Sequence, residues 1–184
     1  MLPAAMRRVR TVPFYLLALG AAIALTSCGG VEPGGAEGKE GEPVVVDEVS
    51  YNVGITRPLN PDDPEDREYL VGQPLPETGT YYLGVFINIF NDTDDTHSTA
   101  HEYTVLDTLD NEYHPLDSES PYALEIGAEV AADGELPEPD TTAQTGPNQG
   151  SLLIFHVDDS VSANLPLKLE IGGSSETGEI ILDI

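Results

Sequence analysis

The stretch Thr80–Asn91, TYYLGVFINIFN, carries the strongest structural signal in this chain of 184 residues. Its side chains alternate between two faces, and both faces are largely apolar. One face carries Tyr81, Leu83, Val85, Ile87 and Ile89, and the other carries Tyr82, Gly84, Phe86, Asn88 and Phe90. A strand that is apolar on both faces is covered on at least one side by another layer of structure. The stretch therefore predicts a central β-strand in a layered fold.

Shorter candidate strands lie on both sides of this stretch and are separated by Gly, Pro, Asn and Asp, the usual turn residues. They span residues 44–55, 101–109, 112–116, 122–126, 151–157, 165–171 and 178–184. Long acidic loops occupy residues 57–66 and 128–150. About eight short strands without a helical period predict an all-β, immunoglobulin-like β-sandwich. We expect this domain to occupy residues 44–184.

The N-terminal segment has the pattern of an export signal. Arg7, Arg8 and Arg10 precede an apolar run over residues 12–25, and no acidic residue interrupts them. The run is shorter than the roughly 20 apolar residues that a permanent membrane span needs. A basic head followed by a short apolar run predicts a cleaved signal peptide over residues 1–27. The alternative is a buried core helix.

Cys28 is the only cysteine of the chain, and Leu25, Thr26 and Ser27 come directly before it. The sequence LTSC resembles the lipobox of bacterial lipoproteins. The resemblance implies cleavage before Cys28 and attachment of a diacylglycerol to its sulfur, because a thiolate is a strong nucleophile. Two acyl chains give stable anchoring, so we expect a protein anchored to the extracytoplasmic face of the cell membrane. The alternative is a secreted protein with a free cysteine.

The segment after Cys28 is rich in glycine and glutamate. Residues 29–43 contain six glycines and no aromatic residue, so we expect residues 28–43 to form a lipidated, flexible linker. Removal of residues 1–27 leaves four basic residues against 33 acidic ones, a net charge of −29. This charge excludes nucleic acid as a partner, because phosphates are bound by Lys and Arg. A cationic partner and a merely solvated acidic surface both remain open.

Four segments together resemble the telokin-like, immunoglobulin-like domain of many bacterial surface lipoproteins, known as domain of unknown function 4352. They are YYLGVFINIFNDTDD (81–95), YTVLDTLDNEY (103–113), GPNQGSLLIFHV (146–157) and LPLKLEI (165–171). The matching positions are Phe86 to Phe90 with Asn91, then Tyr103, Val105, Asp107 and Tyr113, and finally Gly146, Pro147, Phe155 and Val157. The resemblance implies an immunoglobulin-like sandwich outside the cell and no catalytic residue.

The best candidate for a metal site is the acidic turn that contains Asp92, Asp94 and Asp95. Hard cations such as Ca²⁺ prefer oxygen ligands, so the turn is a candidate for weak Ca²⁺ binding if the acids of residues 57–68 converge on it. The alternative is a solvated turn, since Asp and Asn are common turn residues. The chain has no paired-cysteine or HExxH zinc pattern, no G-x-S-x-G motif and no phosphate loop. We therefore expect no catalytic activity and no resident cofactor.

These patterns predict a lipid-anchored lipoprotein whose non-catalytic domain binds an unknown protein or cell-wall partner at the bacterial surface. The alternative is an extracytoplasmic lipoprotein that binds a small ligand or a cation and assists transport or sensing. Acids that converge from residues 57–68 and 91–97 would favour cation binding, whereas an exposed apolar patch would favour a protein partner. The oligomeric state stays open.

Overall fold

A computed structural model describes residues 36–184 of the chain. The predicted signal peptide, the lipobox with Cys28 and the first part of the linker lie outside the described residues. Within residues 36–184, no helix combines the length and the hydrophobicity that crossing a membrane requires.

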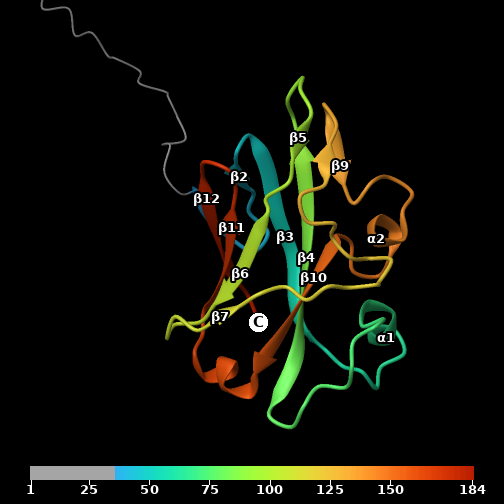
Figure 1. Cartoon of the computed structure of the whole chain (residues 1–184), viewed down its shortest axis with the longest axis vertical. Coiled ribbons are helices and arrows are strands. Elements are labelled where there is room, and N and C mark those ends of the chain that lie inside the picture. Colours follow the sequence, from blue (N-terminus) through green and yellow to red (C-terminus); the bar gives the residue numbers. More distant parts are fainter. Residues whose placement is uncertain (1–35) are drawn as a thin grey trace, which may run out of the picture. The chain divides into compact units, whose positions relative to one another are not determined.

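Two main sheets form the fold (Figure 1). The first has the order β1 (Ala36–Lys39), β12 (Thr177–Leu182), β11 (Leu167–Gly172), β6 (Glu102–Leu106) and β7 (Glu112–Tyr113). The second has the order β10 (Ser151–Asp158), β4 (Thr80–Asn91), β3 (Val49–Leu59) and β2 (Val44–Val46), and β9 (Gly134–Leu136) also pairs with β4. A small ribbon joins β5 (His97–Ser98) and β8 (Glu129–Val130). The predicted all-β sandwich is confirmed.

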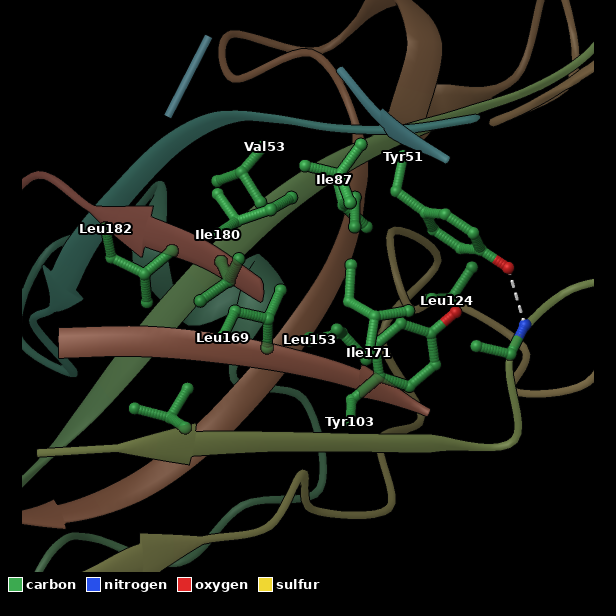
Figure 2. Packing of buried hydrophobic residues seen from close by; sticks show 14 of the residues in the cluster. Tyr51, Val53, Ile87, Tyr103, Leu124, Leu153, Leu169, Ile171, Ile180 and Leu182 are labelled. Atoms are coloured by element: carbon green, nitrogen blue, oxygen red, sulfur yellow. Dashed lines mark hydrogen bonds between the residues drawn. The ribbon is translucent and has the colours of Figure 1, made fainter. Parts of the chain in front are cut away.

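The main core lies between the two sheets, and Figure 2 shows part of it. Ile87 of β4 and Val53 of β3 come from one sheet, and Leu169, Ile171 and Ile180 come from the other. All five side chains are fully buried. Because strand side chains alternate, every second residue of Thr80–Asn91 contributes to this core, as the sequence predicts.

A second apolar cluster covers the outer face of β4. Tyr82 and Phe86 point to this side, and Tyr69 and Tyr122 pack with them. The ring centroids of Tyr69 and Phe86 lie 5.1 Å apart, and those of Tyr69 and Tyr122 lie 4.7 Å apart, both with edge-on geometry. The cover consists of the short helices α1 (Asp66–Tyr69) and α2 (Thr142–Thr145) together with irregular chain. β4 is therefore buried on both faces.

The predicted linker over residues 28–43 is wrong from Ala36 onward. β1 pairs in parallel with β12, and its register joins Ala36 to Gly178 and Lys39 to Ile181. A Cβ atom on Gly38 would lie 2.7 Å from a methyl group of Val44, so this glycine permits close packing rather than flexibility. An edge strand needs backbone hydrogen bonds more than apolar side chains, which is why hydropathy did not detect it. The domain therefore includes residues 36–43 as well as residues 44–184.

Two predicted strands are largely irregular. Residues 112–116 form only the two-residue strand β7, and residues 122–126 form no strand. The irregular chain nevertheless covers the open edge of β10: the N–H of Leu124 donates to the carbonyl of Leu152 at 2.9 Å, and the N–H of Leu152 donates to the carbonyl of Tyr122 at 2.7 Å. The 3₁₀ segment η1 (Asp159–Ala163) links β10 to β11. The irregular segment thus protects the edge of β10 through backbone hydrogen bonds and does not form a regular strand there.

Candidate functional site

The acidic turn after β4 is organised by the buried amide of Asn91. Its Nδ2 donates to the carbonyl oxygens of Asp95, Val130 and Ala131 at 2.8, 3.0 and 2.9 Å. Its Oδ1 accepts from the backbone N–H and the hydroxyl of Thr93 at 3.1 and 2.7 Å. The amide thus meets its hydrogen-bonding capacity with protein atoms alone. The turn is held by Asn91 and needs no cation to fold.

The three aspartates of this turn, Asp92, Asp94 and Asp95, are exposed. The acids of residues 57–68 lie at the other end of the sandwich, because Leu59 pairs with Tyr82 near the start of β4. A strand of 12 residues spans about 40 Å at roughly 3.3 Å per residue. Throughout residues 36–184, no group of three or more His, Cys, Asp or Glu side chains could hold a metal ion. The fold does not assemble the Ca²⁺ site predicted at the three aspartates.

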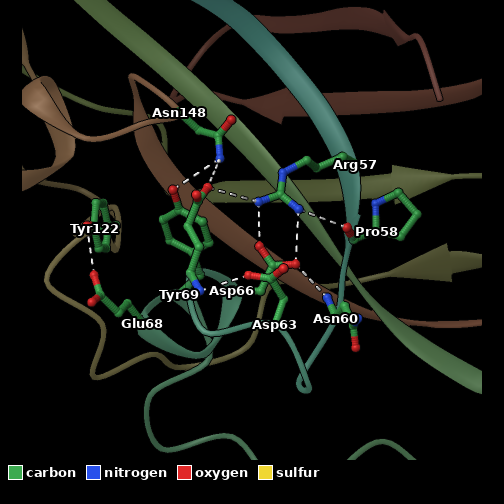
Figure 3. A network of polar contacts seen from close by, with 10 residues as sticks. Arg57, Pro58, Asn60, Asp63, Asp66, Glu68, Tyr69, Tyr122 and Asn148 are labelled. Atoms are coloured by element: carbon green, nitrogen blue, oxygen red, sulfur yellow. Dashed lines mark hydrogen bonds and ion pairs between the residues drawn. The ribbon is translucent and has the colours of Figure 1, made fainter.

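The acidic segment over residues 57–66 is folded around Arg57 (Figure 3). The guanidinium forms a two-pronged ion pair with Asp66, with Nη1 3.1 Å from Oδ2. The same Asp66 oxygen accepts the backbone N–H of Asn60 at 2.7 Å. The hydrogen bond to Asp66 raises the pKa of Arg57 and outweighs the effect of burial. Asp66 is therefore a structural partner of Arg57, not a free ligand.

The four histidines lie at separate places in the fold. Nε2 of His156 is 2.6 Å from the Thr80 hydroxyl, and Nδ1 of His114 is 3.4 Å from the Thr104 hydroxyl. Only His97 and His101 line one hollow, at the end of the sandwich where β4 ends.

That hollow, which we call the loop pocket, has a volume of about 460 Å³ and is formed by three loops. The loops are residues 47–48 between β2 and β3, residues 96–101 around β5, and residues 173–176 between β11 and β12. Its lining includes the carboxylates of Asp47, Glu48 and Glu176, and neither Lys nor Arg. The pocket is therefore a polar site with an excess of negative charge.

Asp47 fixes the geometry of the loop pocket. Asp47 and Glu48 have φ angles of 47° and 67°, which matches the two-residue turn of a β-hairpin. The Asp47 carboxylate accepts from the Ser175 hydroxyl at 2.6 Å and from the backbone N–H groups of Ser174 and Ser175. The Ser175 hydroxyl is the main cause of a lowered pKa at Asp47, because these hydrogen bonds outweigh burial. The side chain is held as a charged carboxylate.

Tyr51 and Thr99 are among the hydroxyl-bearing residues of the lining. The Tyr51 hydroxyl accepts the N–H of Ala100 at 2.7 Å, and burial raises its pKa, so it keeps its proton (Figure 2). Thr99 is 1% exposed, and its hydroxyl lies beside the hydroxyl of Tyr103, a core residue that does not line the pocket. Sequence reasoning missed Asp47 and Thr99. The pair Asp47-Glu48 contains no glycine, and the usual two-residue hairpin signals depend on one, so the sequence gives no clear signal for this loop.

A second hollow, which we call the apolar groove, lies at the opposite end of the sandwich. It has a volume of about 370 Å³ and is lined by Pro58, Tyr81, Asp159, Ser162, Leu165 and Ile184. Leu165 is 45% exposed and Ile184 is 42% exposed. Large apolar side chains that stay in water around a hollow are typical of a contact surface.

Comparison with known proteins identifies the fold without a family. No family model matches the chain, and no curated protein matches it. The yjhA protein of Bacillus subtilis has a similar structure, with a TM-score of 0.54 and 13% identity over 79% of this chain and 99% of that one. A β-sandwich protein of Clostridium difficile matches with a TM-score of 0.48 and 13% identity, over 83% of this chain and 97% of that one.

A third similar structure, ycdA of Bacillus subtilis, is described as a candidate lipoprotein. It has a TM-score of 0.49 and 13% identity, and the match covers 79% of this chain and 39% of that one. At this identity the similarities concern the fold alone. The structural neighbours of the chain are β-sandwich proteins, and one of them is a candidate lipoprotein.

Proposed function

We propose that this chain is a lipid-anchored lipoprotein on the extracytoplasmic face of a bacterial membrane, and that its sandwich is a non-catalytic module that binds a protein partner. The observation that carries the proposal is the apolar groove. The lipobox sequence around Cys28 supports the anchor, and the β-sandwich fold agrees with a binding module.

The proposal includes membership of the telokin-like family, and the turn after β6 supports it. Asp107 is buried, and its carboxylate accepts the N–H groups of Leu109 and Asn111 at 2.8 and 3.0 Å. It also accepts the side-chain amides of Asn111 and Asn164 at 2.8 and 3.0 Å. Burial raises the pKa of Asp107, but the hydrogen bonds together lower it. These hydrogen bonds are a physical reason for an aspartate at this position of the family motif.

The anchor would hold one end of the domain closer to the membrane than the other. Seven residues separate Cys28 from Ala36, and an extended chain spans at most about 28 Å over that distance. Ala36 pairs with Gly178 at the start of β12, next to the loop-pocket end of the sandwich. A lipidated Cys28 would keep this end within that distance of the membrane, and the apolar groove at the opposite end would stay accessible to a partner.

The apolar groove suits a partner with apolar side chains between basic ones. Asp159 lines it, and Asp158 and Asp183 are exposed neighbours along the chain. Arg57 and Lys168 do not neutralise these acids, because Arg57 pairs with Asp66 and Nζ of Lys168 lies 2.8 Å from Glu179. Charge complementarity therefore favours a partner surface with Lys or Arg around an apolar centre.

Photo-cross-linking in intact cells tests the groove. A photoreactive residue at position 165 should give one discrete cross-linked product, and Ile184→Ser should weaken it. A photoreactive residue at position 75 is the control, because Leu75 is 77% exposed and does not line the groove. Equal products from the two positions, or no product from position 165, would contradict the proposal.

Cys28→Ser tests the anchor separately. The unaltered protein should sediment with membranes and carry the mass of an attached diacylglycerol. The variant should lose both properties, because it has no thiol to acylate. A variant that stays membrane-bound with an unchanged mass would overturn the lipoprotein assignment without affecting the groove.

A further inference from the structure

We infer that a hollow on the outer face of β4 binds a neutral sugar ring. This hollow, which we call the amide hollow, has a volume of about 270 Å³ and is lined by residues of β4, β9, α2 and the chain before β10. The inference goes beyond the proposed protein partner. It depends neither on the lipid anchor nor on the apolar groove, because none of the residues that line the amide hollow lines the groove.

Side-chain amides dominate the polar lining of the amide hollow. They come from Asn88 of β4, Gln144 of α2 and Gln149. The chain has 33 acidic residues but only seven asparagines and three glutamines, so a random sample of its polar side chains would consist mainly of carboxylates. Among residues 36–184, Glu135 supplies the only carboxylate of the lining, and no basic side chain belongs to it. The hollow is therefore a weakly charged site in a strongly acidic chain.

The hydrogen bonds of the other amides provide the independent observation. Six side-chain amides outside the hollow form hydrogen bonds within the protein, those of Asn60, Gln73, Asn91, Asn111, Asn148 and Asn164. Within residues 36–184, the side chains of Asn88, Gln144 and Gln149 form none. The fold uses its other amides as structural links, whereas those of the amide hollow keep their donors and acceptors for a ligand.

Asn52 is the remaining amide, and it lies at the same place in the sheet. It is directly opposite Asn88 in the antiparallel pair of β3 and β4, so the two side chains share the outer face. Its Oδ1 is buried and has no hydrogen-bond partner among the described residues. The amides that the fold leaves without partners are thus gathered in one region.

These groups suit a sugar. A side-chain amide offers both donors and acceptors, and so does each hydroxyl of a sugar. The half-buried ring of Phe90 lines the same hollow, and the negative face of an aromatic ring attracts the C–H groups of a sugar ring. Glu135 and the acidic chain disfavour an anionic sugar. The volume is below the range of about 300–1,000 Å³ that holds drug-sized ligands, which limits the occupant to about one ring.

A peptide fits the amide hollow less well than a sugar does. Peptides commonly bind to a sheet by adding a strand at an open edge. At this place β4 has no open edge, because Asn88 pairs with Asn52 of β3 and Phe90 pairs with Glu135 of β9. The binding groups are therefore side chains above the sheet, and a sugar needs no others.

Two-dimensional ¹H–¹⁵N NMR on the purified full-length protein tests the inference, because it observes side-chain NH₂ groups directly. The probes are glucose, galactose, mannose and N-acetylglucosamine, and the peptide control is trialanine. We expect at least one sugar to shift the NH₂ signals of Asn88, Gln144 and Gln149 in a saturable way and to leave that of Gln73 unchanged. The uronic acid of the same sugar should bind more weakly. No shift with any of the four sugars, equal shifts with trialanine, or equal binding of the uronic acid would overturn the inference.

A matched pair of variants locates the binding. Gln149→Ala should weaken binding of the sugar about fivefold, the loss of one neutral hydrogen bond. Gln149 is exposed and its side chain forms no hydrogen bond within residues 36–184, so the substitution leaves the fold intact. Gln73→Ala is the control, because Gln73 is a glutamine outside the hollow whose Nε2 donates to the carbonyl of Asp117 at 2.6 Å. Equal binding by the two variants would show that the amide hollow is not the site.

The linear tetramer of the sugar that binds best separates two sources of the ligand. Tighter binding of the tetramer than of the single sugar would support a neutral sugar presented at the end of a glycan chain. Equal or weaker binding of the tetramer would support a free sugar, because a hollow for about one ring gains nothing from further rings.

Discussion

The Asp47 carboxylate accepts a hydrogen bond of 2.6 Å from the hydroxyl of Ser175, which lies 128 residues further along the chain. Asp47 belongs to the hairpin of β2 and β3 in one sheet, and Ser175 belongs to the hairpin of β11 and β12 in the other. The N–H of Asp47 also donates to Glu176 at 3.2 Å. This contact closes one wall of the loop pocket and joins the two sheets at that end.

Asp47→Asn should make the free energy of unfolding less dependent on pH in the acidic range. The pKa of Asp47 in the folded protein lies below its ordinary value of 3.8, so its contribution to stability is present above pH 3.8. That contribution is lost as the pH falls through the lower, folded pKa. The variant should be less stable than the parent at pH 7, and the difference should narrow below pH 3.8.

Urea denaturation between pH 7 and pH 2 measures this difference. Asp94→Asn is the control, because Asp94 is exposed in the turn that Asn91 organises and its side chain accepts no hydrogen bond from residues 36–184. A difference between Asp47→Asn and the parent that stays constant over the whole range would contradict the proposed linkage.

Asp66→Ala should destabilise the fold strongly. Asp66 is 4% exposed and pairs with the partly buried Arg57, and removal of one partner of a buried pair costs about 3–5 kcal/mol. Glu65→Gln is the control, because its carboxylate is 3.8 Å from Arg57 in a more exposed pair, worth at most about 1 kcal/mol. Chemical denaturation of both variants measures the contrast, and equal losses would show that Asp66 has no special role.

Gly150→Ala should cost more than Gly79→Ala. Both glycines have positive φ angles, 133° and 91°, so each substitution carries a backbone cost of about 1–3 kcal/mol. A Cβ atom on Gly150 would also lie 3.0 Å from the backbone nitrogen of Ile87 and 3.1 Å from the carbonyl carbon of Phe86, whereas one on Gly79 meets nothing within 4 Å. Thermal unfolding separates the two, and equal shifts in Tm would refute the steric argument.

Shortening the chain tests the corrected domain boundary. A chain of residues 36–184 keeps β1, whereas a chain of residues 44–184 loses its pairing with β12 and the Glu40 carboxylate that accepts the N–H groups of Thr56 and Asp183. Each lost hydrogen bond is worth about 1 kcal/mol, so the shorter chain should be a few kcal/mol less stable. Urea denaturation compares the two chains. Equal midpoints would mean that residues 36–43 do not stabilise the fold and behave as a flexible linker.

The strands were predictable where side chains alternate. Thr80–Asn91 shows its two faces directly in its sequence, and the structure buries both. The predicted strand over 151–157 corresponds to β10 for the same reason. β1 was not predictable, because backbone hydrogen bonds to β12 create it and its residues carry no apolar period.

The candidate site was less predictable than the fold. Asp92, Asp94 and Asp95 are close in sequence, and this closeness led to the prediction of a metal site. The hydrogen bonds of Asn91 account for the shape of the turn without a metal. The loop pocket joins residues 47–48, 96–101 and 173–176, which no local pattern connects. Acidic residues are so common in this chain that their identity does not distinguish a site from a solvated surface.

The sequence by itself determined that the chain forms a sandwich of short strands, since the alternation of apolar residues and the turn residues between them are local properties. It also determined the strong negative charge and the lipobox pattern at Cys28. Only the tertiary structure decided which acidic side chains lie close together and which acid forms an ion pair with Arg57. It also decided which end of the sandwich carries the polar pocket and which carries the apolar groove. These outcomes depend on long-range strand pairing, such as that of β1 with β12, which brings together residues that the sequence separates by more than a hundred positions.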